Sequence, residues 1–106
     1  MTTRSFPEAE RDIIDASDYY DQLQADLGDD FVTEARNAIA RVTAQPRLYG
    51  QVSPPVRGRD VREAPVRQFP YKVVYEVTAT EVIIVAVVHV RRDRRRWRPR
   101  LSTPRP

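Results

Sequence analysis

The sequence has no cysteine, one histidine and three glycines among its 106 residues. The absence of cysteine excludes a disulfide framework, a thiolate metal site and a thiol enzyme. One histidine leaves too few ligands for most metal centres, and the chain has no HExxH motif, GxGxxG motif or phosphate-binding loop. We therefore expect neither a metal nor a cofactor.

Long apolar runs are missing as well. No run approaches the roughly 20 residues that span a membrane, and the opening stretch MTTRSFPEAERD has no apolar signal core. These absences predict a cytoplasmic protein that makes no contact with a membrane.

The net charge of +3 conceals an acidic and a basic half. Residues 1–45 contain 10 acidic and 4 basic side chains, a balance of −6, whereas residues 46–106 contain 5 acidic and 14 basic side chains, a balance of +9. All the basic residues except Lys72 are arginines, whose planar guanidinium suits carboxylate and phosphate partners. Genomic bias toward arginine is the alternative explanation. The two halves face different partners or each other.

Two amphipathic helices are predicted in the acidic half. Pro7 suits the first position of a helix. Apolar residues then recur at alternating spacings of four and three, at Ala9, Ile13, Ala16, Tyr20, Leu23 and Leu27. We expect Gly28 to end this helix. Asp29 or Asp30 then caps a second helix, which stops before Pro46.

The basic half predicts a β-sheet. Strands are expected over Asp60–Phe69, Tyr71–Val77 and Glu81–Val90, with a short additional strand over Thr2–Phe6. Pro65 marks the first of the three as an edge strand. The last is apolar at nearly every position, which is typical of a central strand covered on both faces. The fold class is therefore α+β, with a short N-terminal strand, an antiparallel helical hairpin and a three-stranded antiparallel meander whose one face the hairpin covers.

A block of arginines, HVRRDRRRWRPR, follows the apolar strand directly. We expect a single domain over residues 1–97 and a flexible, basic, proline-rich tail over residues 98–106. The block is either a solvated face or a surface for an anionic partner. A lone tryptophan among arginines, Trp97, usually packs onto its own domain or onto a partner.

The remaining chemical groups are tyrosines, arginines and the histidine on the predicted sheet. Side chains alternate between the faces of a strand, so Tyr71 shares a face with Tyr75, and His89 shares one with Val85 and Ile83. On a common face, arginine could stabilise a phosphorane and His89 could move a proton near neutral pH. The alternative is that the tyrosines are core residues and His89 is a satisfied residue at a strand end.

Three stretches together resemble the RelE/ParE family of bacterial toxins from type II toxin–antitoxin modules. They are the helix start PEAERD, the strand PYKVVYEV and the ending VVHVRRDRRRW, and the resemblance runs from Phe6 to Trp97. The family fold is the α+β arrangement predicted above. One departure concerns the helix start, where members usually carry a capping Ser or Thr and this chain has Phe6.

The resemblance implies a toxin, and the ending is more similar to ParE members, which poison DNA gyrase, perform no chemistry and serve in plasmid stabilisation. One alternative is a RelE-like, ribosome-dependent messenger RNA endoribonuclease, and a weaker one is an inactive module that only binds its antitoxin. The paired lysines of such nucleases are absent. Residues at positions comparable to the nuclease site are Arg62, Arg67, Tyr71, His89 and Arg91.

The resemblance also implies a cognate ParD-like antitoxin that is acidic, partly disordered and joined to the toxin in a hetero-oligomer. The toxin would then meet DNA only indirectly, through the antitoxin. The residues expected to bind the target or the antitoxin are Arg91, Arg92, Arg94, Arg95, Trp97, Tyr19 and Tyr20.

Overall fold

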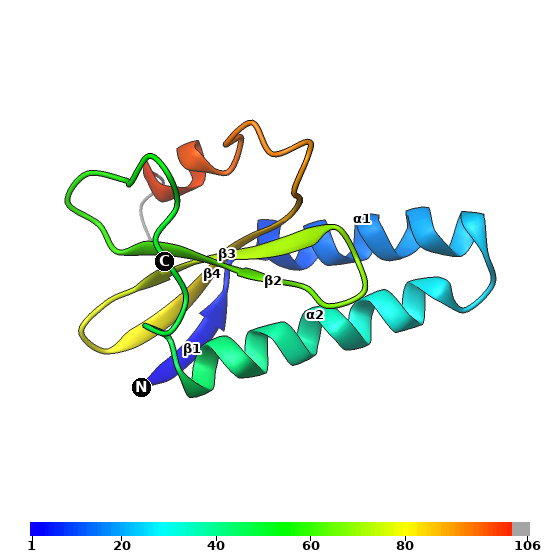
Figure 1. The fold of residues 1–106 in the computed structure, drawn as a ribbon, viewed down its shortest axis with the longest axis horizontal. Coiled ribbons are helices and arrows are strands. Elements are labelled where there is room, and N and C mark those ends of the chain that lie inside the picture. Colours follow the sequence, from blue (N-terminus) through cyan, green and yellow to red (C-terminus); the bar gives the residue numbers. More distant parts are fainter. Residues whose placement is uncertain (103–106) are drawn as a thin grey trace.

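The computed structural model describes residues 1–102 and contains a four-stranded sheet with a helical hairpin on one face (Figure 1). The elements, in chain order, are β1 (Thr2–Ser5), α1 (Pro7–Leu23), α2 (Leu27–Ala44), β2 (Val61–Pro65), β3 (Tyr71–Val77), β4 (Glu81–His89) and the 3-10 helix η1 (Arg98–Ser102). The strand order is β1-β4-β3-β2, with β1 parallel to β4 and the other pairs antiparallel. This architecture confirms the predicted α+β class.

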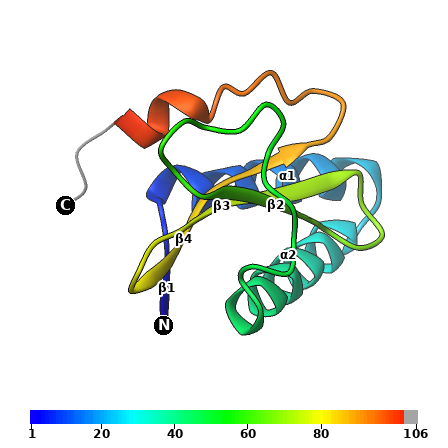
Figure 2. The same ribbon diagram turned by 60° about the vertical axis from the view of Figure 1, so that its left-hand side comes forward.

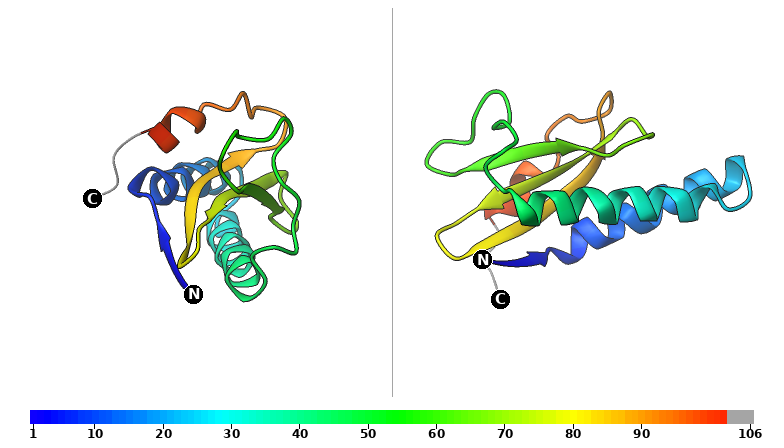
Figure 3. Two further views of the ribbon diagram at one scale, coloured as in Figure 1. Left: turned by 90° about the vertical axis from the view of Figure 1, so that its left-hand side faces the viewer. Right: turned by 60° about the horizontal axis from the view of Figure 1, so that its bottom comes forward.

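The two faces of the sheet are covered by different kinds of structure. The helices α1 and α2 pack on one side, while the loop between α2 and β2 and the chain after β4 lie side by side on the other (Figures 2 and 3). Arg59 joins these two irregular segments by donating a hydrogen bond to the carbonyl of Leu101 at 2.6 Å. Strand β4 is buried without exposure from Val82 to Ala86, which confirms its predicted central place.

Helix α1 begins at Pro7, as its sequence predicts. Phe6 occupies the capping position and makes no side-chain hydrogen bond to the helix, so the usual Ser or Thr cap is indeed missing. The apolar positions face the sheet, and its buried residues are Ala9, Ile13, Ala16 and Tyr20. A two-point ion pair between Glu10 and Arg36, at 2.7 and 2.9 Å, fastens α1 to α2.

The prediction that Gly28 ends the first helix is wrong. Helix α1 stops at Leu23, Asp26 adopts a left-handed conformation with φ of 68°, and Gly28 lies in the first turn of α2. A Cβ atom at Gly28 would lie 2.4 Å from the carbonyl oxygen of Ser17 and 2.6 Å from an oxygen of Asp21. The glycine is therefore required by the close approach of the helices.

A bulge between β3 and β4 changes which residues share a face. Tyr71 pairs with His89 and Val74 with Ala86, but Tyr75 pairs with Ile84, so Val85 has no partner in the ladder. Beyond the bulge the alternation along β4 is reversed. His89 therefore shares its face with Tyr71. The prediction that His89 shares a face with Ile83 is wrong, because the bulge lies between them.

Two strand ends also differ from the prediction. Strand β2 is an edge strand, as Pro65 indicated, but it ends at that proline. Phe69 lies in the following turn, which is closed by a 2.9 Å hydrogen bond from the Val66 amide to the Tyr71 carbonyl. Strand β4 ends at His89, one residue before the predicted end at Val90. Within residues 1–102 no helix is long and apolar enough to cross a membrane.

Candidate functional site

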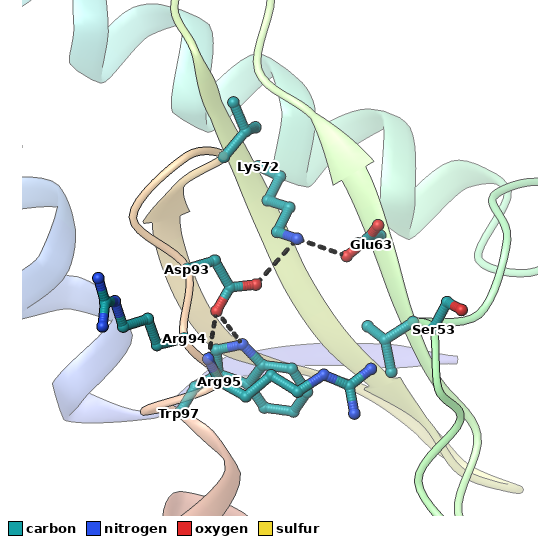
Figure 4. Close-up of a pocket in the computed structure, with 9 residues that line it drawn as sticks. Ser53, Glu63, Lys72, Asp93, Arg94, Arg95 and Trp97 are labelled. Carbon is teal, nitrogen blue, oxygen red and sulfur yellow. Dashed lines mark hydrogen bonds and ion pairs between the residues drawn. The ribbon is translucent and has the colours of Figure 1, made fainter.

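The arginine segment, residues 91–97, leaves the end of β4 and is held against the sheet by its single acidic residue. Oδ1 of Asp93 accepts hydrogen bonds from the backbone amide of Arg95 at 2.7 Å and from the indole Nε1 of Trp97 at 3.0 Å. Its other oxygen, Oδ2, pairs with Nζ of Lys72 at 2.9 Å (Figure 4). One carboxylate therefore fixes the segment to strand β3.

Lys72 completes a charged triad under the segment. Its Nζ lies 2.8 Å from Glu63 on β2 and 2.9 Å from Asp93. Burial opposes the charge of the lysine, but the two carboxylates outweigh it and raise the pKa of Lys72. Burial likewise opposes ionisation of Asp93, yet the hydrogen bonds from Lys72 and from the Arg95 amide lower the pKa of Asp93. Lys72 and Asp93 are therefore both charged at neutral pH.

A pocket of about 390 Å³ opens at this triad, between the arginine segment and the loop that precedes β2. Arg95 reaches across it toward Ser53, whereas Arg94 points away (Figure 4). The guanidinium of Arg95 lies 5.6 Å from the centre of the Trp97 ring and donates a hydrogen bond to the carbonyl of Pro54. Arg95, predicted as a binding residue, is thus a link between two segments of the fold.

Trp97 is a core residue. Its side chain is only 1% exposed, which leaves almost none of the indole for a partner to contact. The predicted role of Trp97 in binding is therefore corrected: it supports the arginine segment from below. The sequence left open whether Trp97 packs onto its own domain or onto a partner, and the structure shows the first of the two.

The packed chain continues beyond Trp97 into the residues that the sequence assigned to a tail. Arg100 pairs with Asp12 of α1 at 2.7 and 3.2 Å and donates to the carbonyl of Val85 at 3.0 Å. Asp12 also accepts the amide of Val87 at 3.0 Å. Strand β1 ends at Ser5, opposite Ile84. Beyond that point Arg100 and Asp12 take its place, because they bond the backbone carbonyl of Val85 and the backbone amide of Val87 on the edge of β4. Residues 103–106 lie outside the described part of the chain.

Four arginines of the segment project into solvent. In the part of the chain that the structure describes, none of them has an ion pair. They are Arg91, Arg92, Arg94 and Arg96. The anchored backbone therefore presents a concentrated positive surface without using these side chains to hold itself in place.

A second pocket, of about 280 Å³, lies between α1 and the start of the arginine segment. Tyr19, Tyr71 and Arg92 line it. Tyr19 is 45% exposed, whereas Tyr20 is buried and stacks on Phe31 with ring centres 5.5 Å apart. Of the two tyrosines predicted to bind, Tyr19 is the accessible one, and Tyr20 belongs to the core.

His89 stands beside this pocket, with its ring centre 5.3 Å from that of Tyr71. Its Nδ1 accepts the backbone amide of Arg91 at 3.1 Å, which requires that nitrogen to be unprotonated. Burial, then Arg92 and Arg91, lower the pKa of His89. The histidine is therefore neutral at physiological pH.

The five residues proposed for a nuclease do not form one cluster. Tyr71, His89 and Arg91 lie together, but Arg62 is opposite Tyr75, about 13 Å further along the sheet at roughly 3.3 Å per residue. The guanidinium of Arg62 is occupied by Asp60 at 2.9 Å and by two loop carbonyls at 2.6 and 3.1 Å. Arg67 lines a separate pocket near the end of α2.

Sequence reasoning missed the groups that hold the site together. These groups form two ion pairs, Asp93 with Lys72 and Asp12 with Arg100. The partners of each pair are far apart in the sequence, so no local spacing predicts them. The single acid within RRDRRRW was the one available signal, because an isolated carboxylate among arginines tends to be bound by them or by a buried cation. In residues 1–102 no group of three His, Asp or Glu side chains is arranged to hold a metal ion.

Comparison with known proteins gives a family match and a match to solved structures. The sequence profile of a family described as the ParE toxin of the type II toxin–antitoxin system parDE matches residues 6–94. A solved structure of the chromosomal ParDE toxin–antitoxin system from P. aeruginosa has a similar fold, with a TM-score of 0.64 at 19% identity. The match covers 85% of this chain and 96% of that one. No curated protein sequence matches significantly.

Proposed function

The chain belongs to the ParE toxin family of type II toxin–antitoxin systems, and from this premise we propose that it inhibits DNA gyrase and is neutralised by a cognate ParD-like antitoxin. The observation that carries the proposal is the arginine segment, a fixed loop with four exposed guanidinium groups that have no carboxylate partner in residues 1–102. Such a surface suits a target that is itself bound to nucleic acid.

The geometry favours a binding toxin over a nuclease. A nuclease needs an acid and a base that converge on one phosphate, whereas Arg62 and Arg67 lie apart from His89 and Arg62 is engaged in the fold. His89 is neutral and can exchange a proton, but the titrating group packed against it is Tyr71, and burial raises the pKa of that phenol. The two alternatives, a RelE-like endoribonuclease and an inactive module that only binds its antitoxin, are distinguished by the test below.

The same basic surface suits an acidic antitoxin. An antitoxin that covers the exposed arginines prevents their contact with the target, and toxin and antitoxin then form a hetero-oligomer that meets DNA through the antitoxin. Gyrase and nascent antitoxin are both cytoplasmic, so we propose this compartment for the toxin. We also propose that the chain forms one toxin domain. In the described residues, its last element of secondary structure ends at Ser102.

The test is a direct one on purified components. The toxin is added to DNA gyrase in a supercoiling assay and, in parallel, to a translating extract in which ribosome-bound message is followed by primer extension. We expect loss of supercoiling with message intact, and restoration of supercoiling when the protein encoded beside the toxin gene is added. Cleaved message with unaffected gyrase would instead establish the nuclease, and neither effect would indicate an inactive module.

A further inference from the structure

A further pocket, of about 340 Å³, lies at the end of α2 and beside the loop that follows it. This end of α2 is on the far side of the molecule from the chain after β4 (Figures 1 and 2). The pocket, which we call the α2-end pocket, is lined by Arg41, Ala44, Gln45, Leu48, Tyr49 and Arg67. Leu48 is 67% exposed, more than any other large hydrophobic side chain in the described residues. The apolar wall of the pocket is therefore open to a ligand.

The α2-end pocket carries positive charge that nothing in it balances. Its two cations are Arg41 and Arg67, and among the described residues no acidic side chain lines it. The side chain of Arg67 makes no hydrogen bond or ion pair within residues 1–102. Arg41 has no ion pair there either, and it donates one long hydrogen bond, at 3.4 Å, to the carbonyl of Pro65. Two guanidinium groups are therefore available to an anion.

The loop that forms one side of this pocket is held from within the fold. Tyr75, which is fully buried, donates its hydroxyl to the carbonyl of Pro46 at 2.7 Å. Arg62 donates to the carbonyls of Arg47 and Tyr49 at 3.1 and 2.6 Å. The backbone of this wall is therefore fixed before a ligand arrives, which reduces the entropy lost on binding.

We propose that the α2-end pocket binds a nucleotide with a terminal phosphate, either free or at the end of a nucleic acid strand. The phosphate pairs with Arg41 and Arg67, whose planar forks match its oxygens. The base packs on the ring of Tyr49 and on Leu48, as bases do on aromatic side chains in single-strand sites. Gln45 supplies a carboxamide that can donate to and accept from the edge of the base. This inference goes beyond the proposed function and does not depend on gyrase or on an antitoxin.

A nucleotide suits this pocket better than an acidic peptide does. A terminal phosphate carries a charge of about −1.5 to −2 at neutral pH, which two unpaired arginines balance, whereas a carboxylate carries a single charge. The volume of about 340 Å³ lies near the lower end of the roughly 300–1,000 Å³ that is usual for small-ligand pockets. Such a volume matches one nucleotide and not an extended peptide.

The experiment measures ligand binding to the full toxin by isothermal titration calorimetry at one fixed, low salt concentration. The probes are adenosine monophosphate, adenosine, inorganic phosphate, and a trinucleotide with and without a 5′-phosphate. Arg67→Gln removes one charge from the pocket. Its matched control is Arg47→Gln, because Arg47 is an exposed arginine of the neighbouring loop that does not line the pocket. Tyr49→Leu removes the aromatic face and keeps an apolar side chain, whereas Tyr49→Phe keeps the ring.

We expect adenosine monophosphate to bind the wild type at least about tenfold more tightly than adenosine or inorganic phosphate, because each of these lacks one of the two contacts. Arg67→Gln and Tyr49→Leu should each raise its dissociation constant about tenfold. Arg47→Gln and Tyr49→Phe should change it less than about threefold. Tighter binding of the 5′-phosphorylated trinucleotide than of the monophosphate would assign the site to a strand end, and weaker binding would assign it to a free nucleotide.

Circular dichroism melts establish that each variant is folded. The side chain of Arg67 has no partner to lose within residues 1–102, so Arg67→Gln should melt like the wild type. The charge test therefore remains decisive even if a Tyr49 variant fails to fold.

Several results would overturn the inference. Equal weakening by Arg47→Gln and Arg67→Gln would show that the general positive charge attracts the nucleotide and that the pocket does not. Loss of binding in a folded variant with Arg94→Ser and Arg96→Ser would move the site to the arginine segment. Displacement of the nucleotide by a short acidic peptide that contains leucine, at a lower concentration than adenosine monophosphate itself requires, would make the pocket a protein-binding surface. None of these results bears on gyrase inhibition, so the proposed function is tested separately.

Discussion

The carboxylate of Asp93 accepts a hydrogen bond from the indole nitrogen of Trp97, four residues later, at 3.0 Å. The same carboxylate holds Lys72 of β3 at 2.9 Å. The acid in the most basic stretch of the chain is thus what gives that stretch a fixed shape. Because Asp93 and the buried Trp97 hold the backbone, the neighbouring arginines are free to face a partner.

Removing the charge of Asp93 should destabilise the fold. In Asp93→Asn the amide oxygen can still accept the Trp97 hydrogen bond, but Lys72 loses one of its two carboxylate partners. We expect the free energy of unfolding to fall by about 2–3 kcal/mol, since one member of a largely buried pair is left behind. Urea unfolding measures this. Asp18→Asn, at an exposed position of α1, serves as the control and should change stability by less than about 0.5 kcal/mol.

The contribution of Asp93 should disappear in acid. Its pKa is lowered in the folded protein, so the stability it supplies is present above its unfolded-state pKa of about 4 and is lost as the pH falls through the folded pKa. The difference in unfolding free energy between wild type and Asp93→Asn should be full near about pH 6 and shrink below about pH 4. A difference that stayed constant in acid would contradict the assigned ion pair.

Gly28→Ala should destabilise the protein, although the position is helical. Alanine normally stabilises a helix by up to about 1 kcal/mol relative to glycine. Here its Cβ would lie 2.4 Å from the backbone oxygen of Ser17, so α1 and α2 must separate, at a cost of about 1–3 kcal/mol. Thermal melting followed by circular dichroism gives the sign. A higher melting temperature would show that the helices do not approach as closely as described.

Trp97 should behave as a core residue. We expect Trp97→Ala to lose about 3–5 kcal/mol of stability through the cavity it leaves. Trp97→Phe keeps a ring but lacks the donor to Asp93, and should lose less, about 1–2 kcal/mol. Urea unfolding followed by circular dichroism compares them, since both variants lack the chain's single tryptophan. If Trp97→Ala were as stable as the wild type, Trp97 would not be a core residue, and a direct role in binding would again be open to it.

The sequence predicts the elements whose signals are local. Pro7 and the apolar spacing of α1 locate the first helix, and the apolar run of β4 identifies a central strand. Gly28 misled the prediction because a glycine that ends a helix and one that lets two helices touch look alike in sequence. The difference appears only once Gly28 is seen against Ser17.

The candidate site was harder to predict, because its geometry depends on contacts between distant residues. The bulge at Val85 decides which side chains share a face with His89, and it follows from the pairing of β3 with β4, which no single strand reveals. The anchors of the arginine segment are likewise long-range, as in the pair of Asp12 with Arg100. The arginines themselves were visible in the sequence, but which of them are free was not.

We predict that the exposed arginines of the anchored segment, and not proton transfer by His89, are responsible for the activity of this toxin. Gyrase supercoiling, measured against toxin concentration for three proteins, tests it most directly: wild type, His89→Gln, and a variant in which Arg91, Arg92, Arg94 and Arg96 are serine. We predict that His89→Gln inhibits within about threefold of wild type, because removal of a true acid–base group reduces rates by about 10²–10⁴. The four-serine variant, confirmed as folded by its melt, should need at least about tenfold more protein, since each lost charged contact weakens binding. Full inhibition by the folded four-serine variant would show that these arginines are not needed, and loss of inhibition in a folded His89→Gln would show that the histidine is.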